Sequence, residues 1–248
     1  MIPYKDENPT DLTPVITIGI IVVNALVWLL VQGAGVDGAV LVRSVCELGL
    51  IPGEVLRTVP PGTAVPVGPG MRCLVTAQPH WWTVATSMFL HAGWLHIIGN
   101  MVFLFVFGIH VERSMGGIRY AIFYLLCGLG ASALEIATSA GSNLPGLGAS
   151  GAISGVLAGY LVMYPTSHVR TLIPLGFFFW TARLPAWVFI GFWFLLQVVE
   201  GLASLNSVSS GGGVAYSAHV GGFVTGLLLV RLFAHSTRVA SMRVYHGS

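Results

Sequence analysis

Charged side chains are scarce in this chain. Asp, Glu, Lys and Arg make up 8% of its 248 residues, whereas an average soluble domain has about 25%. Hydrophobic residues make up 55% of the chain, and the mean hydropathy is +0.83. Such a chain cannot cover a water-facing surface with polar groups, so we exclude a soluble globular protein and expect the lipid bilayer to be its solvent.

Clusters of basic residues are missing too, and cysteine is rare. The net charge is only +2 and there is no run rich in Lys and Arg, which argues against nucleic acid as a partner. The three cysteines form no CxxC motif and have no zinc-ligand spacing. Cys46 and Cys73 fall in one predicted outer loop, where an oxidising compartment would allow a disulfide. Cys127 is expected to pack inside a helix.

Six apolar segments are present, and each is a candidate for a membrane span, which needs about 20 apolar residues. The polar start of the chain does not resemble a cleaved signal peptide. We expect a single domain over residues 13–235, with tails at 1–12 and 236–248 and a long first outer loop at 33–93. The fold class is therefore predicted as an all-α, six-helix membrane bundle. Its spans are residues 13–32, 94–110, 120–138, 150–164, 185–204 and 216–233.

The basic residues indicate an orientation. With a cytoplasmic N-terminus, eight of the eleven fall in inner segments. The other three, Arg43, Arg57 and Arg72, lie in the long loop, where the positive-inside rule is weak. We therefore expect both termini to be cytoplasmic, in a membrane of the bacterial plasma-membrane type.

Polar residues gather at the outer ends of three spans. The second, fourth and sixth spans all run inward, so their N-terminal ends share one side of the membrane. His91, His96 and Asn100 lie near the start of the second, Ser150 opens the fourth, and His219 lies early in the sixth. Polar groups in a bilayer face the bundle interior or a water-filled cavity. We expect one shared, water-accessible site.

Glycines recur every four residues on the fourth and sixth spans. Small residues at this spacing let membrane helices approach closely. The contact would hold the imidazole of His219 against the hydroxyl of Ser150. The expected packing glycines are Gly151, Gly155 and Gly159 on one helix and Gly222 and Gly226 on the other.

A serine beside a histidine suits nucleophilic catalysis. The hydroxyl is a poor nucleophile until a base takes its proton, and histidine does this near neutral pH. His96 and Asn100 are four residues apart and share a helix face. Together with the backbone N–H of Ser150, they would donate hydrogen bonds to a developing oxyanion.

These residues together resemble the rhomboid intramembrane proteases. His91 to Asn100 has the family's HxxxxHxxxN form, Gly148 to Gly151 its GxSG form, and Ala218 to Gly226 its AHxxGxxxG form. Glu112-Arg113 with Gly117 is similar to a further family element. Two places depart from the family pattern. Thr83 follows Trp81-Trp82 where the family often has arginine after the tryptophan, and Ile109-His110 replaces an Asp-Asn pair.

The resemblance implies a function and assigns roles. Ser150 would be the nucleophile and His219 the base, without a third acid. His96, Asn100 and the Ser150 N–H would form the oxyanion site. The first loop would be embedded in the membrane, and the fifth span with the loop at residues 206–213 would admit substrates. Those substrates would be other transmembrane proteins, and no metal or cofactor is implied.

Two other functions fit some of these features. A rhomboid-like pseudoprotease would bind membrane clients without cutting them, but it would lack the serine or the histidine. A small transporter would place charged residues or broken helices at the midplane. Glu135 and Glu200 lie within spans, yet near their outer ends, and we interpret them as local hydrogen-bond partners.

Other chemistry is less well supported. The GxSxG elbow of α/β-hydrolases fails because Ala152 stands at the second glycine. Zinc binding by His91, His96 and His219 has no HExxH motif or neighbouring carboxylate to support it. His91 alone could meet water at the membrane interface or cap its helix.

Overall fold

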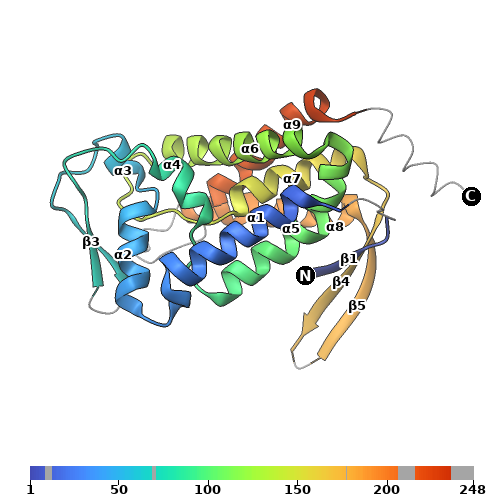
Figure 1. Ribbon diagram of the computed structural model, residues 1–248, viewed down its shortest axis with the longest axis horizontal. Coiled ribbons are helices and arrows are strands. Elements are labelled where there is room, and N and C mark those ends of the chain that lie inside the picture. Colours follow the sequence, from blue (N-terminus) through green and yellow to red (C-terminus); the bar gives the residue numbers. More distant parts are fainter. Residues whose placement is uncertain (9–12, 69–70, 177, 206–215, 236–248) are drawn as a thin grey trace, which may run out of the picture.

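A bundle of helices makes up most of the computed structural model, which describes residues 1–8, 13–68, 71–176, 178–205 and 216–235. The helices run side by side along the long axis of the molecule (Figure 1). They are α1 (Val15–Leu26), extended by the π-helical turn η1 (Val27–Val31), α5 (Trp94–Met115), α6 (Gly117–Thr138), α7 (Ser150–Met163), α8 (Ala186–Leu205) and α9 (Tyr216–Phe233).

Four of these helices have the length and apolar composition to cross a membrane. They are α5, α6, α8 (over Ala186–Ala203) and α9. The first and fourth predicted spans coincide with shorter apolar helices, Val15–Val31 and Ser150–Met163. Helix α7 occupies the middle of the bundle, and packs against α5, α6 and α9. Eleven of its fourteen residues are buried.

The fold is mostly helical, but the expected all-α class holds only in part, because the chain also forms two small sheets. Strands β1 (Ile2–Asp6), β4 (His168–Leu175) and β5 (Phe178–Pro185) form an antiparallel sheet in the order β1-β4-β5. We expected a polar tail and the link between the fourth and fifth spans here. The link is instead rich in β-branched and aromatic residues, which favour strands, and Gly176, with a φ of 65°, provides the backbone conformation at which it reverses.

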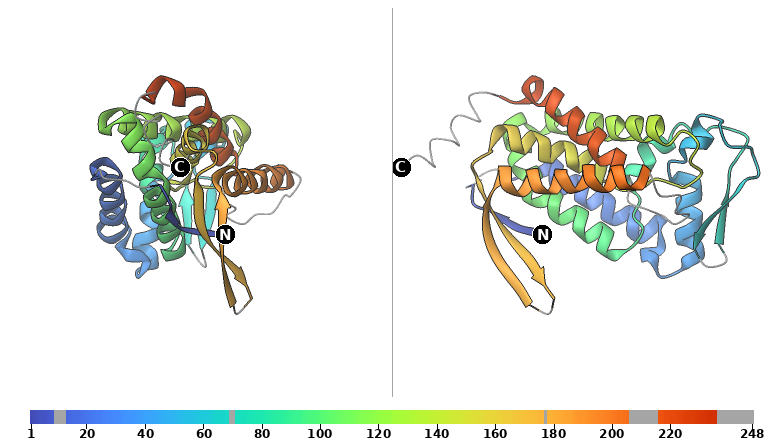
Figure 2. Two further views of the ribbon diagram at one scale, coloured as in Figure 1. Left: turned by 90° about the vertical axis from the view of Figure 1, so that its right-hand side faces the viewer. Right: turned by 180° about the vertical axis from the view of Figure 1, so that it is seen from behind.

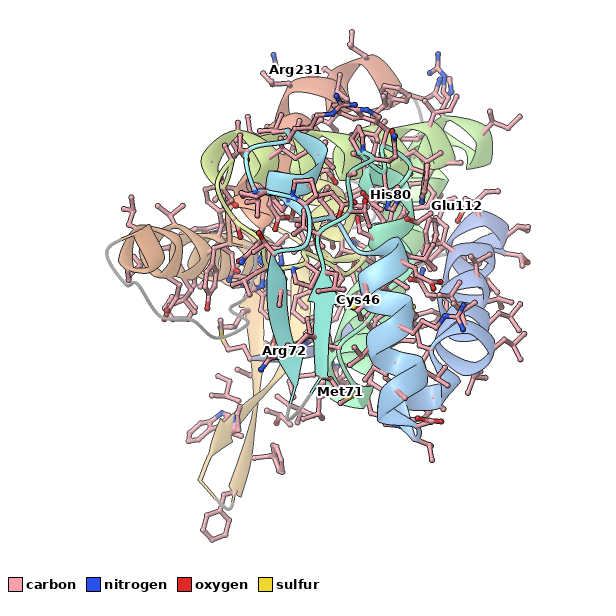
Figure 3. All side chains as sticks on the ribbon, turned by 90° about the vertical axis from the view of Figure 1, so that its left-hand side faces the viewer. Cys46, Met71, Arg72, His80, Glu112 and Arg231 are labelled. Atoms are coloured by element: carbon pink, nitrogen blue, oxygen red, sulfur yellow. A yellow bond between two sulfur atoms is a disulfide. The ribbon has the colours of Figure 1, made fainter. Side chains whose placement is uncertain are left out.

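The long segment between the first two membrane helices is also structured. It contains η2 (Gly33–Gly35), α2 (Gly38–Leu48), α3 (Pro52–Val55), the antiparallel strands β2 (Ala64–Gly68) and β3 (Met71–Leu74), α4 (Thr83–Thr86) and η3 (Ser87–Phe89). A disulfide joins Cys46 of α2 to Cys73 of β3 (Figure 3). The pairing that the sequence left open is therefore present, and it staples the hairpin to the helix.

Two acidic side chains connect distant parts of the fold. Glu112 at the end of α5 accepts hydrogen bonds from the backbone N–H groups of Ile16 and Thr17 at 2.9 and 2.7 Å. It thereby caps α1, whose first N–H groups have no partner within the helix. Asp6 of β1 lies 3.0 Å from Nε2 of His110, and both side chains are buried. His110, at one of the departures from the family pattern, thus holds the terminal strand against α5.

Some predicted segments lie outside the described residues. The loop at 206–213 and the tail at 236–248 are among them.

Candidate active site

Glycines hold α7 and α9 in direct backbone contact. A Cβ atom on Gly222 would lie 1.9 Å from the carbonyl oxygen of Gly151, and one on Gly226 would lie 2.4 Å from that of Gly155. Both distances are too short for any side chain. On another side of α7, a Cβ atom on Gly155 would lie 2.4 Å from the side chain of Cys127 of α6. The glycines thus lie where α7 and α9 meet, as the spacing predicts. Cys127 is buried and packs against Gly155, as expected for a residue inside a helix.

A hydroxyl group fixes the height of one helix against the other. The side chain of Ser154 is fully buried and donates to the carbonyl oxygens of Gly151, at 2.6 Å, and His219, at 2.8 Å. Because one hydroxyl hydrogen bridges α7 to α9, sliding the helices would break this contact. Sequence reasoning missed Ser154; its place between the packing glycines, one turn after Ser150, was the available signal.

Gly222 provides a test of this packing. Gly222→Ala should lower the stability of the folded protein by about 1–3 kcal/mol, the usual cost of overpacking, and separate α9 from α7. We expect a lower melting temperature in detergent and loss of the activity proposed below. The matched control is Gly191→Ala on α8, where an added Cβ would meet no atom within 4 Å. Equal melting temperatures for the two variants would contradict the close contact.

The contact brings Ser150 and His219 together. Nε2 of His219 lies 2.7 Å from Oγ of Ser150. Ser150 is the first residue of α7, and His219 lies in the first turn of α9. His219 is buried, with 7% of its surface exposed. The two groups expected to act together are therefore within hydrogen-bonding distance.

The second nitrogen of His219 has a partner that sequence reasoning missed. Nδ1 lies 2.7 Å from Oε1 of Gln197 on α8. An amide oxygen only accepts hydrogen bonds, so Nδ1 carries the proton and Nε2 presents its lone pair to the Ser150 hydroxyl. The signal in the sequence was a single amide in the apolar stretch Ala186–Ala203.

His96 lies beside the backbone that leads into Ser150. A Cβ atom on Gly148 would lie 2.9 Å from Nε2 of His96 and 3.4 Å from Oγ of Ser150. Nδ1 of His96 accepts a hydrogen bond from the N–H of Ala92 at 3.3 Å. The proton of the neutral ring is then on Nε2, the nitrogen nearest to Gly148. Gly148 has a φ of 126°, which also favours glycine.

Asn100 provides a second amide close to this region. It lies one helical turn after His96 on α5, is buried, and its Nδ2 has no hydrogen-bond partner within the described residues. An amide that can donate but has no acceptor is costly to bury. His96 and Asn100 thus offer an imidazole N–H and an unused amide N–H as hydrogen-bond donors.

His91 is buried and makes no side-chain hydrogen bond that caps α5, so the alternatives of a histidine that meets water or caps its helix are wrong. Its exposed surface is 0%, and its ring lies 5.1 Å from that of His96. The side-chain amide of Gln32 donates to the backbone carbonyl oxygen of His91 and accepts from the backbone N–H of His91, both at 2.8 Å. Burial, together with the neighbouring His96, lowers the pKa of His91 to about 3. The His91 ring is neutral near pH 7 and packs edge-on against the ring of His96.

A small cavity adjoins the serine. Its volume is ≈ 20 Å³, which is enough for about one water molecule. Ser87, Ser132, Glu135 and Ser150 contribute its polar lining. Glu135 therefore lies close to the site, whereas Glu200 is exposed on α8. In the described part of the chain, no three His, Cys, Asp or Glu side chains are grouped to hold a metal ion.

Several known proteins are similar to this chain in sequence. RHOMBOID-like protein 4 of Arabidopsis thaliana is 37% identical over 149 residues, which are 60% of this chain and 33% of that protein. Rhomboid protease AarA of Providencia stuartii is 29% identical over 178 residues, 65% of this chain and 60% of the relative. Rhomboid protease GluP of Bacillus subtilis (strain 168) is 36% identical over 100 residues, 40% of this chain and 19% of that protein.

The chain spans less than two thirds of the length of each of these relatives. A family model, the Rhomboid domain, matches residues 78–236, which include α5 to α9 with His96, Asn100, Ser150, Gln197 and His219. Because this match covers well over half of the sequence, the chain belongs to the rhomboid family of multi-pass membrane proteins.

Proposed function

We propose that this protein is an intramembrane serine endopeptidase that hydrolyses peptide bonds in or near the transmembrane segments of other membrane proteins. The observation that carries the proposal is the 2.7 Å contact between Nε2 of His219 and Oγ of Ser150. Two named proteases among the relatives add support. No cofactor or metal has a part in the scheme.

Acylation follows from the positions of the groups. Ser150 Oγ attacks the scissile carbonyl carbon as His219 Nε2 takes its proton. The carbonyl oxygen becomes an oxyanion, which accepts hydrogen bonds from His96 Nε2–H, Asn100 Nδ2–H and the Ser150 N–H. His219 then passes the proton to the leaving amine, the C–N bond breaks, and an ester on Ser150 remains.

Deacylation repeats these steps with water. His219 takes a proton from a water molecule, which attacks the ester carbon, and the serine leaves with that proton. The cavity beside Ser150 can hold one water molecule. The products are a carboxylate, an amine and the free enzyme.

We further propose six spans, both termini in the cytoplasm and a site that opens to the outer side of a bacterial-type plasma membrane. The Cys46–Cys73 disulfide supports this orientation, since disulfides persist outside the cytosol. Helix α7 has 14 residues and covers about 21 Å, less than the roughly 30 Å hydrocarbon core. Its first residue, Ser150, would then lie below the outer surface.

The test uses the whole chain in lipid vesicles with a single-span membrane protein as substrate. We expect a specific cut in or near the span, and labelling of the enzyme by a fluorophosphonate probe at Ser150, located by peptide mass analysis. Binding of the substrate without cleavage or labelling would instead indicate a pseudoprotease and reject the proposal.

A further inference from the structure

Helix α8 contributes one buried polar side chain to the candidate site. Gln197 is 9% exposed. Its Nε2 donates to the carbonyl oxygen of Trp193 in the same helix at 3.1 Å, and its Oε1 lies 2.7 Å from Nδ1 of His219. The first bond anchors the amide, and it leaves the oxygen directed at the imidazole.

We infer that Gln197 is a positioning residue that sets the tautomer and the orientation of His219; this rests on the proposed function. Ser150 and Gln197 contact opposite nitrogens of one ring. The Gln197 oxygen keeps the proton on Nδ1, so the lone pair on Nε2 faces the hydroxyl that must lose its proton. Without Gln197, the ring could turn over or place the proton on Nε2, and neither arrangement makes a base.

The surroundings of the ring show why one side chain has this effect. The indole of Trp193 lies 5.8 Å from the His219 ring, so α8 covers His219 with an apolar surface and a single acceptor. An apolar residue at 197 would leave the buried Nδ1–H without a partner, and a buried unpaired donor is costly. The base would then prefer arrangements that satisfy Nδ1 elsewhere.

Helix α8 is also the least enclosed of the four long apolar helices. Only 22% of Ala186–Ala203 is buried, against 44% of the most apolar part of α5. Helix α8 lies at the flank of the bundle (Figure 2). Its contact with His219 therefore depends on α8 staying packed against α9. A shift of α8 would therefore break the contact between Gln197 and His219, and His219 would lose the tautomer in which Nε2 is the base.

Gln197 can be tested with two substitutions in vesicles. Gln197→Leu keeps the size and removes the acceptor, so kcat should fall about tenfold to a hundredfold with little change in KM. Fluorophosphonate labelling of Ser150 should slow by a similar factor. Gln197→Glu replaces a neutral acceptor with a carboxylate, which favours the protonated imidazole. The acid limb of the kcat/KM profile should then move to higher pH. The control is Leu196→Ala, because Leu196 is 40% exposed on α8.

The outcomes separate this inference from the proposed function. If the wild type neither cleaves nor labels, the proposed function fails. If the wild type is active and Gln197→Leu matches it, only the inference fails. The inference is also overturned if Gln197→Leu is slow but Gln197→Glu leaves the pH profile in place, since this would indicate a packing role alone.

A separate feature concerns the hairpin formed by β4 and β5. Strand β1 pairs only with residues 169–172 of β4. Beyond residue 172, β4 pairs with β5 alone among the described strands, with Ile173 opposite Trp180 and Pro174 opposite Phe179. No charged residue occurs between Arg170 and Arg183. The hairpin starts at the end of the bundle where α7 ends, and it projects obliquely away from the helices to one side (Figures 1 and 2).

The tip of this hairpin is aromatic and uncovered. Phe178 is 79% exposed, Phe179 66% and Trp180 65%. A lone two-stranded ribbon is at best marginally stable in water, and exposed apolar patches of this kind mark an interaction surface. Aromatic residues, tryptophan above all, gather where lipid headgroups meet hydrocarbon. Arg170 and Arg183 at the base share Glu7 as an ion-pair partner and remain exposed.

We propose that the aromatic tip inserts into the interfacial region of the leaflet on the side where α7 ends. The arrangement suits a lipid surface, because the tip lies beside the spans and the arginines at its base can meet anionic headgroups. The hairpin would then be a lateral anchor of the bundle. This proposal does not depend on proteolysis.

A fluorescent reporter can test the insertion in full-length protein. Phe179→Cys would be labelled with an environment-sensitive dye in vesicles of neutral and anionic phospholipid. We expect blue-shifted emission, several-fold stronger quenching by lipids with a nitroxide near the headgroup, and little quenching by aqueous iodide. Lys5→Cys, an exposed position on β1 of the same sheet, is the matched control and should behave in the opposite way. The wild type shows the background, since Cys127 is buried.

Two results would overturn this proposal. Iodide quenching at Phe179→Cys equal to that at Lys5→Cys would place the tip in water. Blue-shifted emission insensitive to both quenchers would show that protein, such as a second copy of the chain, covers the tip.

Discussion

Ser150→Ala is expected to abolish both cleavage of a membrane substrate and labelling by a fluorophosphonate. The substitution removes the only atom that forms the covalent bond, and no other hydroxyl is described next to Nε2 of His219. In serine proteases, loss of the nucleophile costs on the order of 10⁶-fold in kcat. Turnover should therefore fall below detection, as measured by product formation and by in-gel fluorescence of the labelled enzyme.

The fold of this variant should persist. Ser150 contributes its hydroxyl to the histidine, whereas the helix contact depends on the glycines and on the Ser154 hydroxyl. Its melting temperature in detergent should stay close to the wild-type value. A matched control is Ser114→Ala at the far end of α5, where the hydroxyl bonds to the carbonyl oxygen of His110. That variant should keep its activity; persistent labelling of Ser150→Ala would remove this serine from the scheme.

The residues of the candidate site could be placed from the sequence because their geometry depends on helix periodicity. Glycines four residues apart must lie on one face, and Ser150 and His219 flank those faces at the same end. Close approach of the glycines then determines the distance between the two side chains. Gln197 escaped prediction for a related reason. It comes from α8, which carries no such stripe, so the sequence did not show the rotation of this helix about its axis.

The parts of the fold that were missed depend on pairing between distant segments. Residues 2–6 and 169–172 form a sheet only because the chain returns to the same place after α7. A polar terminal segment by itself carries no sign of that partner. The hairpin was missed because its aromatic run, broken by prolines, has no strict alternation of polar and apolar residues. The disulfide required the distance between Cys46 and Cys73, which spacing in the sequence does not supply.

His219→Ala is expected to lower turnover by a factor on the order of 10⁶, as for Ser150→Ala, while the protein stays folded. The contact between Ser154 and residue 219 uses the backbone carbonyl oxygen, so the substitution leaves that hydrogen bond in place. The serine would lose the acceptor for its proton, and the leaving amine would lose its donor. Initial rates in vesicles measure the loss, and circular dichroism with a melting curve checks the fold.

The double variant Ser150→Ala, His219→Ala sharpens this prediction. Groups that act as one unit give losses that do not add, because removal of either already disables the shared step. Its rate should therefore equal that of the single variants within error. If His219→Ala alone retained wild-type turnover, the proton would have to leave Ser150 by another route. Glu135, the carboxylate that lines the cavity next to Ser150, would then be the residue to replace, because it is the titratable group among the described residues that line this cavity.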